Sequence, residues 1–279
     1  MYKKKCFFAF IFPLFFYHTN AQSLKLITYN IRLDVAVDGE NDWTHRKAFL
    51  ASQIVFYAPD IFGVQEATPN EMVDLDSMLQ TYSHIGNGRE GIGKGEASAI
   101  FYNKSKFKIK NETTFWLSET PNVMSKGWDA SYLRVCTYAL FTDIKNKKTF
   151  WVFNTHLDHM GEIARTNGIQ LILKKITEVN TKKYPVIFMG DLNSEPNTDR
   201  IIALKKQMKD TKEISIEKPF GPSGSFNNFE HNKPVTKLID YIFISKNNNW
   251  KVNKYAVLSD SDKMRYPSDH LPVFAEILY

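Results

Sequence analysis

The first third of the chain alternates short apolar runs with amphipathic segments. The apolar runs Leu24–Asn30 and Asp60–Gln65 predict two buried strands, the second of which ends just before Glu66. A helix is predicted after each strand, the first starting at the polar residues 41–44 and the second capped by Asn70. The apolar positions that keep a helical period are Phe49, Leu50, Ile54 and Val55 in the first helix and Met72, Leu75, Met78 and Leu79 in the second. This region therefore predicts strands that helices cover.

Strand patterns follow one another in the middle of the chain and then give way to mixed elements. The predicted strands are 97–103, 113–118, 132–141, 149–156, 185–191, 238–245 and 271–278. One helix is predicted over Ile163–Val179 and a shorter one after residue 191. The lysine-rich stretches Lys104–Lys110 and Lys145–Lys148 are predicted to be exposed hairpin ends. The pattern indicates one α/β domain of packed sheets flanked by helices, not a purely parallel doubly wound sheet.

The N-terminus has the pattern of an export signal. Lys3–Lys5 form a positive head, Cys6–Tyr17 is an apolar run interrupted by Pro13, and small residues precede a cleavage site after Ala21. The apolar run is shorter than the roughly 20 residues that span a bilayer. We therefore predict a signal peptide over 1–21 and an exported mature domain over 22–279. No later stretch is apolar enough to be a transmembrane segment.

Composition changes this picture in one respect, which is the charge. The chain has 279 residues, 43% of them hydrophobic, and a formal net charge of +6. Such a surplus is typical of proteins that bind nucleic acid or anionic membranes. Lys3–Lys5 are the only charged residues of the predicted signal, however, so the mature domain keeps 33 basic against 30 acidic groups, or +3. The remaining surplus is small and dispersed, and nucleic acid is a possible but not a favoured partner.

The cysteine count excludes a disulfide framework. Of the two cysteines, Cys6 lies in the predicted signal, and Cys136 is left alone in a strand. We expect Cys136 to be a small core residue. A nucleophilic role is the alternative, but its neighbours Val135 and Thr137 offer no partner for one.

Polar side chains recur where the predicted strands begin or end. These residues are Asn30, Glu66, His156, Asp191, Asn193, Asp240, Asp269 and His270. Any one of them has an ordinary explanation in turn or capping chemistry. Taken together, they are better explained by a shared site, because functional groups gather at strand ends that face one cleft.

The residue types indicate metal-assisted phosphate chemistry. Asn30, Glu66 and Asp269 are oxygen donors that suit a hard cation such as Mg²⁺ or Mn²⁺, whereas zinc would favour clustered His or Cys. His156 and His270 can offer a proton or a positive charge to an anion. A cation flanked by such groups suits hydrolysis of a phosphate ester. The chain has no G-x-S-x-G elbow and no P-loop to support a competing chemistry.

At these positions the chain resembles the endonuclease/exonuclease/phosphatase superfamily, in the branches of the deoxyribonucleases and sphingomyelinases. The motifs that carry the resemblance, in order, are TYNIR (28–32), GVQEA (63–67), NTHLDH (154–159), GDLNSEP (190–196), IDYIF (239–243) and SDHLPV (268–273). The resemblance implies a four-layer α/β sandwich, in which two face-to-face, mostly antiparallel mixed sheets are flanked by helices. It also implies a divalent-metal phosphoesterase.

The resemblance also implies roles for the metal-binding residues. Glu66 would be the principal metal ligand, with Asn30 and Asp269 close to or on the metal. The implied cation is Mg²⁺ or Mn²⁺.

The remaining motif residues would carry the proton transfer and hold the phosphate. His270 would be the general base or the group that binds the scissile phosphate, with Asp240 holding its ring in one tautomer. Asp191 would orient or deprotonate the attacking water, and Asn193 and His156 would donate to phosphate oxygens. Asp191 and His270 remain alternative bases.

Several other residues are candidates for binding the substrate. Trp43, Trp116, Trp128 and Arg134 either line a cleft or serve the core, and both interpretations stay open.

Three hypotheses of function follow. The first is an exported phosphoesterase that acts on a phosphate ester, with a phosphodiester of a small molecule, glycan or lipid headgroup as the leading substrate. The second is a secreted nuclease acting on DNA or RNA, and the third is a non-catalytic binding module. We expect a monomer.

Overall fold

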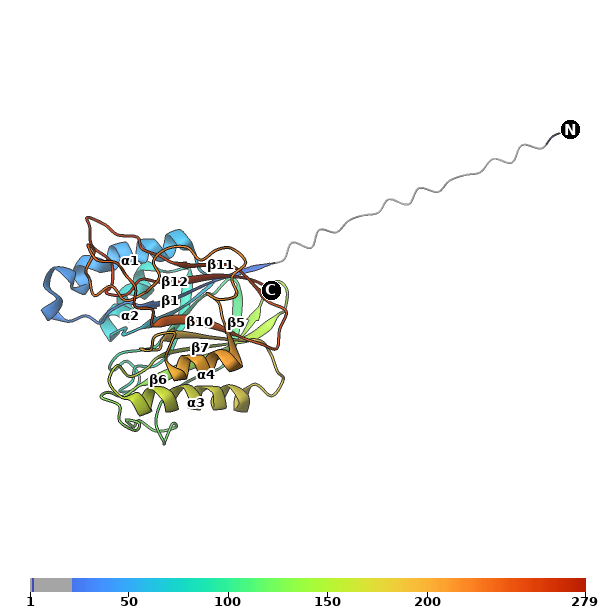
Figure 1. Cartoon of the computed structure of the whole chain (residues 1–279), viewed down its shortest axis with the longest axis horizontal. Helices are drawn as coiled ribbons and strands as arrows, with labels where there is room; N and C mark the ends of the chain where they lie inside the picture. Colours follow the sequence, from blue (N-terminus) through green and yellow to red (C-terminus); the bar gives the residue numbers. More distant parts are fainter. Residues whose placement is uncertain (1, 3–21) are drawn as a thin grey trace.

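Two six-stranded mixed sheets form the centre of the molecule (Figure 1). The computed structural model describes Tyr2 and residues 22–279, so the rest of the predicted signal peptide lies outside the described residues. The first sheet has the order β11 (Lys251–Val257), β12 (Val273–Leu278), β1 (Ser23–Asn30), β2 (Ile61–Gln65), β4 (Ile100–Asn103), β3 (Tyr82–Ile85). The second has the order β5 (Phe107–Trp116), β6 (Val135–Asp143), β7 (Thr149–His156), β8 (Val186–Asp191), β10 (Asp240–Ser245), β9 (Met208–Asp210).

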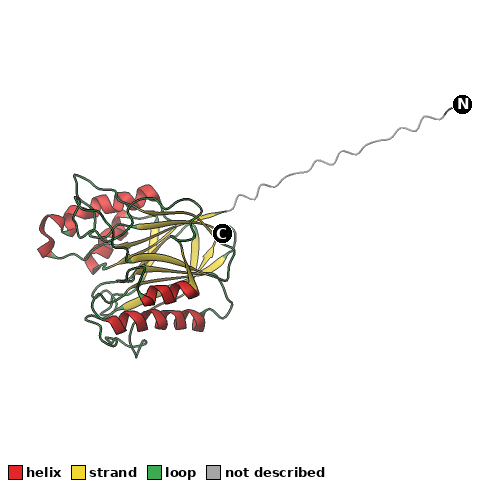
Figure 2. Cartoon of the chain, in the orientation of Figure 1, coloured by secondary structure: helices red, strands yellow, loops and turns green. Residues whose placement is uncertain are grey.

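Helices cover the outer faces of both sheets, which confirms the four-layer sandwich (Figure 2). The helices are α1 (Trp43–Tyr57), α2 (Pro69–Met78), α3 (Glu162–Val179) and α4 (Asp199–Gln207), with a short 3-10 segment at Ala36–Asn41. Leu50 of α1 packs in one apolar cluster with Phe62 of the first sheet, and Ile172 of α3 packs in another with Phe188 of the second. A third cluster fills the space between the sheets. None of the described helices has the length and apolar character needed to cross a membrane.

Helix α1 begins where its polar residues predict and buries part of the expected face. The side chain of Asp42 accepts a hydrogen bond from the backbone N–H of His45, which satisfies a free donor of the first turn. Leu50 and Ile54 are buried, as predicted. The prediction was wrong for Val55, which is 61% exposed, because the buried face is continued instead by polar Gln53.

Other predictions about individual elements also need correction. Thr68, not Asn70, caps α2, because Glu71 reaches back to the backbone N–H of Thr68 at 2.8 Å while Asn70 already lies inside the helix. Lys145–Lys148 lies between the paired strands β6 and β7, as expected of a hairpin end. Lys104–Lys110 is not a hairpin end, since it leads from β4 in one sheet into β5 in the other. Strands β3, β9 and β11 were not predicted.

Buried polar contacts lock the two sheets together close to their functional edge. The side-chain amide of Asn154 on β7 donates to the carbonyl oxygens of Val64 and Ala99 at 2.9 and 2.8 Å, so β7 is hydrogen-bonded to the opposite sheet. Gln65 donates to Asn154 Oδ1 at 2.7 Å. A Cβ at Gly63 would lie 2.6 Å from the Asn154 side chain, so only glycine admits this close approach.

The topology brings the predicted strand-end residues to one edge. Strand β1 is parallel to β2 in the first sheet, and β7 is parallel to β8 in the second. Within each pair, the carboxyl ends of the two strands therefore lie at the same edge. Strand β10 runs antiparallel to β8 and begins at this edge, where Asp240 pairs with Asp191. Asp191 in turn pairs with His156 on its other side. Three neighbouring strands therefore present three polar side chains in register.

Candidate active site

A cleft of about 630 Å³ opens at this edge. The predicted residues that line it are Glu66, Arg134, His156, Asp191, Asn193, Asp269 and His270. Asn30 and Asp240 are buried and hydrogen-bond directly to lining residues. We call the following eight residues the floor of the cleft: Asn30, Glu66, His156, Asp191, Asn193, Asp240, Asp269 and His270. All eight strand-end residues named from the sequence thus belong to one site.

A chain of buried ionisable groups runs along the floor. Asp240 Oδ2 lies 2.8 Å from His270 Nδ1, and Ser225 donates to the same carboxylate at 2.6 Å. Because the carboxylate accepts, Nδ1 of His270 carries a proton and Nε2 faces Asp191, 3.8 Å away. Asp191 Oδ2 also lies 3.4 Å from His156 Nε2. Asp240 therefore orients the His270 ring.

Burial and neighbouring charges shift the pKa values of these groups. Burial favours the neutral form of His270, yet the carboxylates around it, Asp240 first, outweigh burial and raise the pKa of His270 to about 10. Burial and then the charge of Asp240 raise the pKa of Asp191 to about 7, against the opposing effect of His270. Burial, assisted by the charge of Arg134, holds the pKa of His156 well below its usual value. The floor thus holds one imidazole that favours its charged form and one that favours its neutral form.

A second group of oxygen donors lies beside this chain. Asn30 Nδ2 donates to Glu66 Oε1 and to Asp191 Oδ2, both at 3.0 Å, and the Asn30 oxygen accepts the Arg32 backbone N–H. Burial, and the nearby charge of Glu66, raise the pKa of Asp269. Repulsion between carboxylates that share a buried site is what a bound cation relieves.

These residues fit a hard divalent cation. Glu66 and Asp269 supply carboxylate oxygens, and Asn30 holds Glu66 and Asp191 in place through its amide N–H groups. Asp191, Asp240 and His270 also bring one ligand atom each within 4.8 Å of one another. Among the buried atoms of the described chain, Asp240 Oδ1 and His156 Nδ1 have no hydrogen-bond partner. These two atoms are therefore available to hydrogen-bond to a bound ligand or to water.

The backbone at the cleft adopts uncommon conformations. Glu66, Asn193 and Arg32 have positive φ angles of 64°, 44° and 58°. Side chains other than glycine seldom adopt this region, and such residues gather at functional sites. The positive φ of Asn193 places its Nδ2 3.0 Å from His156 Nε2.

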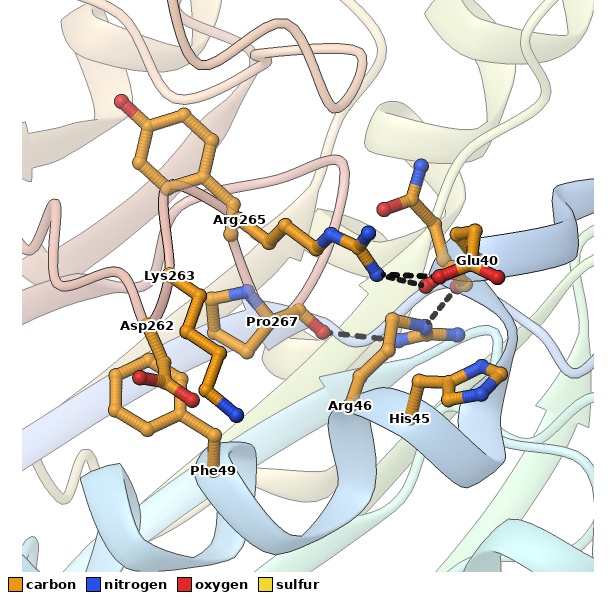
Figure 3. Close-up of a pocket in the computed structure, with 10 residues that line it drawn as sticks. Glu40, His45, Arg46, Phe49, Asp262, Lys263, Arg265 and Pro267 are labelled. Atoms are coloured by element: carbon orange, nitrogen blue, oxygen red, sulfur yellow. Dashed lines mark hydrogen bonds and ion pairs between the residues drawn. The ribbon is translucent and has the colours of Figure 1, made fainter.

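A buried arginine holds the two loops that enter the floor. Arg46, which is 4% exposed, donates to the carbonyl oxygens of Ile31 and Arg32 at 2.6 and 2.8 Å. It also donates to the carbonyl oxygen of Pro267 at 3.0 Å (Figure 3). Glu71 lies 3.9 Å from its guanidinium. We call Arg46 and Glu71 the clamp. It ties the segment after Asn30 to the segment before Asp269, although the motifs gave no sign of it.

The structure separates the candidate substrate-binding residues. Arg134 lines the cleft, where Asp158 and His159 hold its guanidinium at 3.4 and 3.2 Å. The three tryptophans are not among the lining residues of this cleft. Trp43, the first residue of α1, is buried in the core, and its indole N–H donates to Asp74 of α2 at 2.7 Å. Trp116 donates its indole N–H to the carbonyl of Arg89, a lining residue.

Trp128 and Cys136 do not line the cleft either. Trp128 lies in the loop before β6 and has a φ of 48°. Cys136 is fully buried, and burial raises the pKa of its thiol well above the usual value. The thiol is therefore a core group, as predicted.

Sequence reasoning missed about half of the cleft. The additional lining residues are Arg32, Leu33, Arg89, Glu96, Tyr132, His159, Phe226, Asn228, Lys237 and Ile239. Most of them lie in loops that have no hydrophobic period. Arg32, His159 and Ile239 lie inside the quoted motifs, which was the available signal for those three.

The chain belongs to the endonuclease/exonuclease/phosphatase family, whose profile matches residues 27–270. Members of this family are divalent-metal-dependent hydrolases of phosphate esters, and the chain is an enzyme of that class. The hypothesis of a non-catalytic binding module is therefore wrong.

Individual relatives point to more than one substrate. A mannosyl-6-phosphatase from Bacteroides thetaiotaomicron VPI-5482 is 36% identical, with a TM-score of 0.87 over 92% of this chain and 100% of that one. A functionally unknown conserved protein from Enterococcus faecalis V583 is also 36% identical, with a TM-score of 0.85 over 91% of this chain and 99% of that one. A probable RNA exonuclease from Saccharomyces cerevisiae is 25% identical over 66% of this chain, which spans 40% of that relative's length.

Proposed function

We propose that this protein is an exported phosphoesterase that uses Mg²⁺ or Mn²⁺ to hydrolyse a phosphate ester of a glycan or other small molecule. The observation that carries the proposal is the floor of the cleft. There, a buried Asp240–His270–Asp191 chain lies beside the carboxylates of Glu66 and Asp269. Such an arrangement can hold a cation, an anionic phosphate and a water molecule together.

Glu66 and Asp269 would hold the cation, with Asn30 fixing the orientation of Glu66. A bound divalent cation neutralises charge on the phosphate and on the departing oxygen. Asn193 would donate to phosphate oxygens, assisted by the guanidinium of Arg134. His156 Nε2 accepts the Asn193 amide N–H at 3.0 Å in the free site, so His156 would donate to the phosphate only once protonated.

Proton transfer from the attacking water is assigned to one of two neighbouring groups. Asp191 accepts the amide N–H of Asn30, which orients its carboxylate. His270 is oriented by Asp240, and its Nε2 faces Asp191. His270 could take the proton only from its neutral form. While its imidazole is charged, Asp191 would take the proton and His270 would hold the phosphate in line.

The substrate proposal draws on the relatives. The similarity to a mannosyl-6-phosphatase supports a sugar phosphate, which would be a monoester instead of the diester favoured from the sequence alone. An assay with Mg²⁺ and then Mn²⁺ would compare mannose 6-phosphate, bis-p-nitrophenyl phosphate, sphingomyelin and plasmid DNA. We expect the sugar phosphate to be hydrolysed with the highest kcat/KM.

A nuclease is the second candidate, supported by relatives described as probable RNA exonucleases. The small, dispersed charge surplus speaks against it, because nucleic-acid affinity depends on concentrated phosphate contacts. Degradation of plasmid DNA or RNA at enzyme concentrations that leave mannose 6-phosphate intact would replace our proposal with this one.

The proposal of export is supported by the Lys3–Lys5 head and the apolar run behind it. Mass spectrometry of the protein recovered from a producing bacterium should give an N-terminus at Gln22. An intact Met1 on protein from the soluble cell interior would contradict export.

A further inference from the structure

One side of the cleft takes no part in the proposed phosphate chemistry. Arg89, Glu96, Tyr132 and His159 line it and come from three loops. We call these four residues the outer wall. Arg89 Nη2 lies 2.7 Å from Glu96 Oε1, and both side chains keep 14% of their surface exposed. The Arg89 guanidinium lies 5.0 Å from the ring centroid of Tyr132.

The ring of Tyr132 extends this row of contacts to the next loop. It stacks on the ring of His159 with a centroid separation of 5.7 Å and an interplanar angle of 23°. Arg134 lies 3.2 Å from His159 Nδ1, and because a guanidinium only donates, Nδ1 must accept. The neutral imidazole then carries its proton at Nε2. Charged, aromatic and imidazole groups are thus linked from one loop to the next.

Neighbouring residues hold the outer wall in place. The indole N–H of Trp116 donates to the Arg89 carbonyl at 2.7 Å, and the Arg89 N–H donates to the Glu96 carbonyl at 2.8 Å. The Tyr132 N–H donates to Asp158 Oδ2 at 3.2 Å. A binding surface fixed in this way loses little conformational entropy when it takes a ligand.

The chemistry of the outer wall distinguishes between ligands. A nucleobase needs an open aromatic face, but each aromatic ring that lines the described cleft already contacts a cation. Arg89 lies 5.0 Å from the centroid of Tyr132, and Lys237 lies 5.1 Å from that of Phe226. An acyl chain needs an apolar lining, and the wall is mainly polar. Adjacent donors and acceptors, as in Arg89 and Glu96, match the neighbouring hydroxyl groups of a sugar.

We propose that the outer wall is a subsite for the hydroxyl-bearing ring of a sugar whose phosphate lies on the floor of the cleft. Glu96 accepts hydroxyl protons, Arg89 and His159 donate to hydroxyl oxygens, and Tyr132 supplies its phenol and the free edge of its ring. The inference rests on the proposed function, because it assigns the leaving group of that reaction. It makes the outer wall the determinant of specificity and leaves the chemical step to the floor.

The test compares two phosphate monoesters, mannose 6-phosphate and p-nitrophenyl phosphate, which lacks a sugar. We expect Glu96→Gln and Tyr132→Ala each to lower kcat/KM for mannose 6-phosphate at least tenfold, mainly through KM. Hydrolysis of p-nitrophenyl phosphate should stay within twofold. Glu112→Gln is the matched control, because Glu112 is exposed on β5 and does not line the cleft.

The outcomes separate the subsite from the proposed function. Equal losses on both esters, or no loss on either, would overturn the subsite while the phosphoesterase proposal stands. Wild-type protein that hydrolyses p-nitrophenyl phosphate but not mannose 6-phosphate or glucose 6-phosphate would also overturn it. If no ester is hydrolysed, the proposed function fails. Calorimetric titration of mannose 6-phosphate into wild type and Tyr132→Ala then decides the subsite, since equal or absent binding contradicts it.

Discussion

The floor of the cleft and the clamp are both buried, charged and close to the end of β1, but their hydrogen bonds reach different partners. Arg46 of the clamp donates to main-chain carbonyl oxygens, including those of Ile31, Arg32 and Pro267. The floor residues mostly bond to one another, as Asp240 does to His270. Two floor atoms, Asp240 Oδ1 and His156 Nδ1, have no partner among the described residues, and neither does Glu71 Oε1 of the clamp.

The different partners distinguish residues that carry out chemistry from residues that hold loops in position. Bonds to the main chain fix the path of a loop, so the clamp should act on the fold and only indirectly on turnover. Side chains that bond to one another at the surface of a cleft can change partners when a ligand arrives. Substitutions in the floor should therefore remove activity and leave the fold intact.

The largest effect is expected for His270→Ala. Removing the imidazole that Asp240 orients should lower kcat by about 10³-fold or more, because general acid–base and phosphate-binding contributions are lost together. His84→Ala is the matched control, since His84 also lies 2.8 Å from a carboxylate, that of Asp76, but outside the cleft. Circular dichroism should show both variants folded. A near-wild-type rate for His270→Ala would assign the proton transfer to Asp191.

A smaller and reversible effect is expected for Glu66→Gln. The neutral amide should weaken binding of Mg²⁺ or Mn²⁺ by about 100-fold, and excess metal should partly restore turnover. Calorimetric titration with Mn²⁺, beside activity at rising metal concentration, measures both. Lost activity with unchanged metal affinity would show that Glu66 is not a metal ligand. Glu119→Gln, which changes an exposed carboxylate, is the control.

For the clamp, we expect a substitution to lower the stability of the fold strongly and turnover only weakly. Arg46→Lys keeps the charge but cannot reach the same carbonyl oxygens, and each buried carbonyl left unpaired costs about 1–3 kcal/mol. We expect the free energy of unfolding to fall by about 3 kcal/mol and kcat by only about tenfold. Arg265→Lys is the control, since that side chain is 51% exposed and pairs with Glu40 (Figure 3). Unchanged stability with greatly reduced kcat would place Arg46 in the catalytic group.

The smallest effect concerns the pH dependence of stability. Burial, opposed by hydrogen bonds from Thr68, raises the pKa of Glu71 from 4.5 to about 8 in the folded protein. The folded state therefore holds its proton more tightly than the unfolded state. The resulting stabilisation is complete below about pH 4.5 and is lost as the pH rises to about 8.

Glu71→Gln removes this titration. Between pH 5 and pH 8 the wild type should lose about 1–3 kcal/mol of unfolding free energy relative to Glu71→Gln, measured by urea denaturation. Activity should differ little between the two proteins at either pH once both are folded. A constant difference in stability across this range would show that Glu71 ionises normally in the fold.

Much of the floor was predictable because its residues are attached to strongly patterned strands. Asn30, His156 and Asp191 end strands whose apolar runs are unmistakable. Glu66 directly follows β2, and Asn193 lies two residues after the end of β8. The local errors have local causes. Asn70 was taken as a cap because its residue type suits one, although Pro69 and Glu71 make Thr68 the better N-cap. Strand β11 was not predicted, because polar residues and a bulge near Asn253 interrupt its alternation of apolar and polar positions.

By itself the sequence determined the α/β class, the strand-end residues and their chemistry, because apolar periodicity and residue type are local properties. Only the tertiary structure decided which loops complete the cleft. Arg89 and His159 are 70 positions apart yet contact the same tyrosine, and Trp43 enters the core instead of the cleft. Such contacts depend on how two sheets and their loops close in space, and no pattern along one segment encodes that closure.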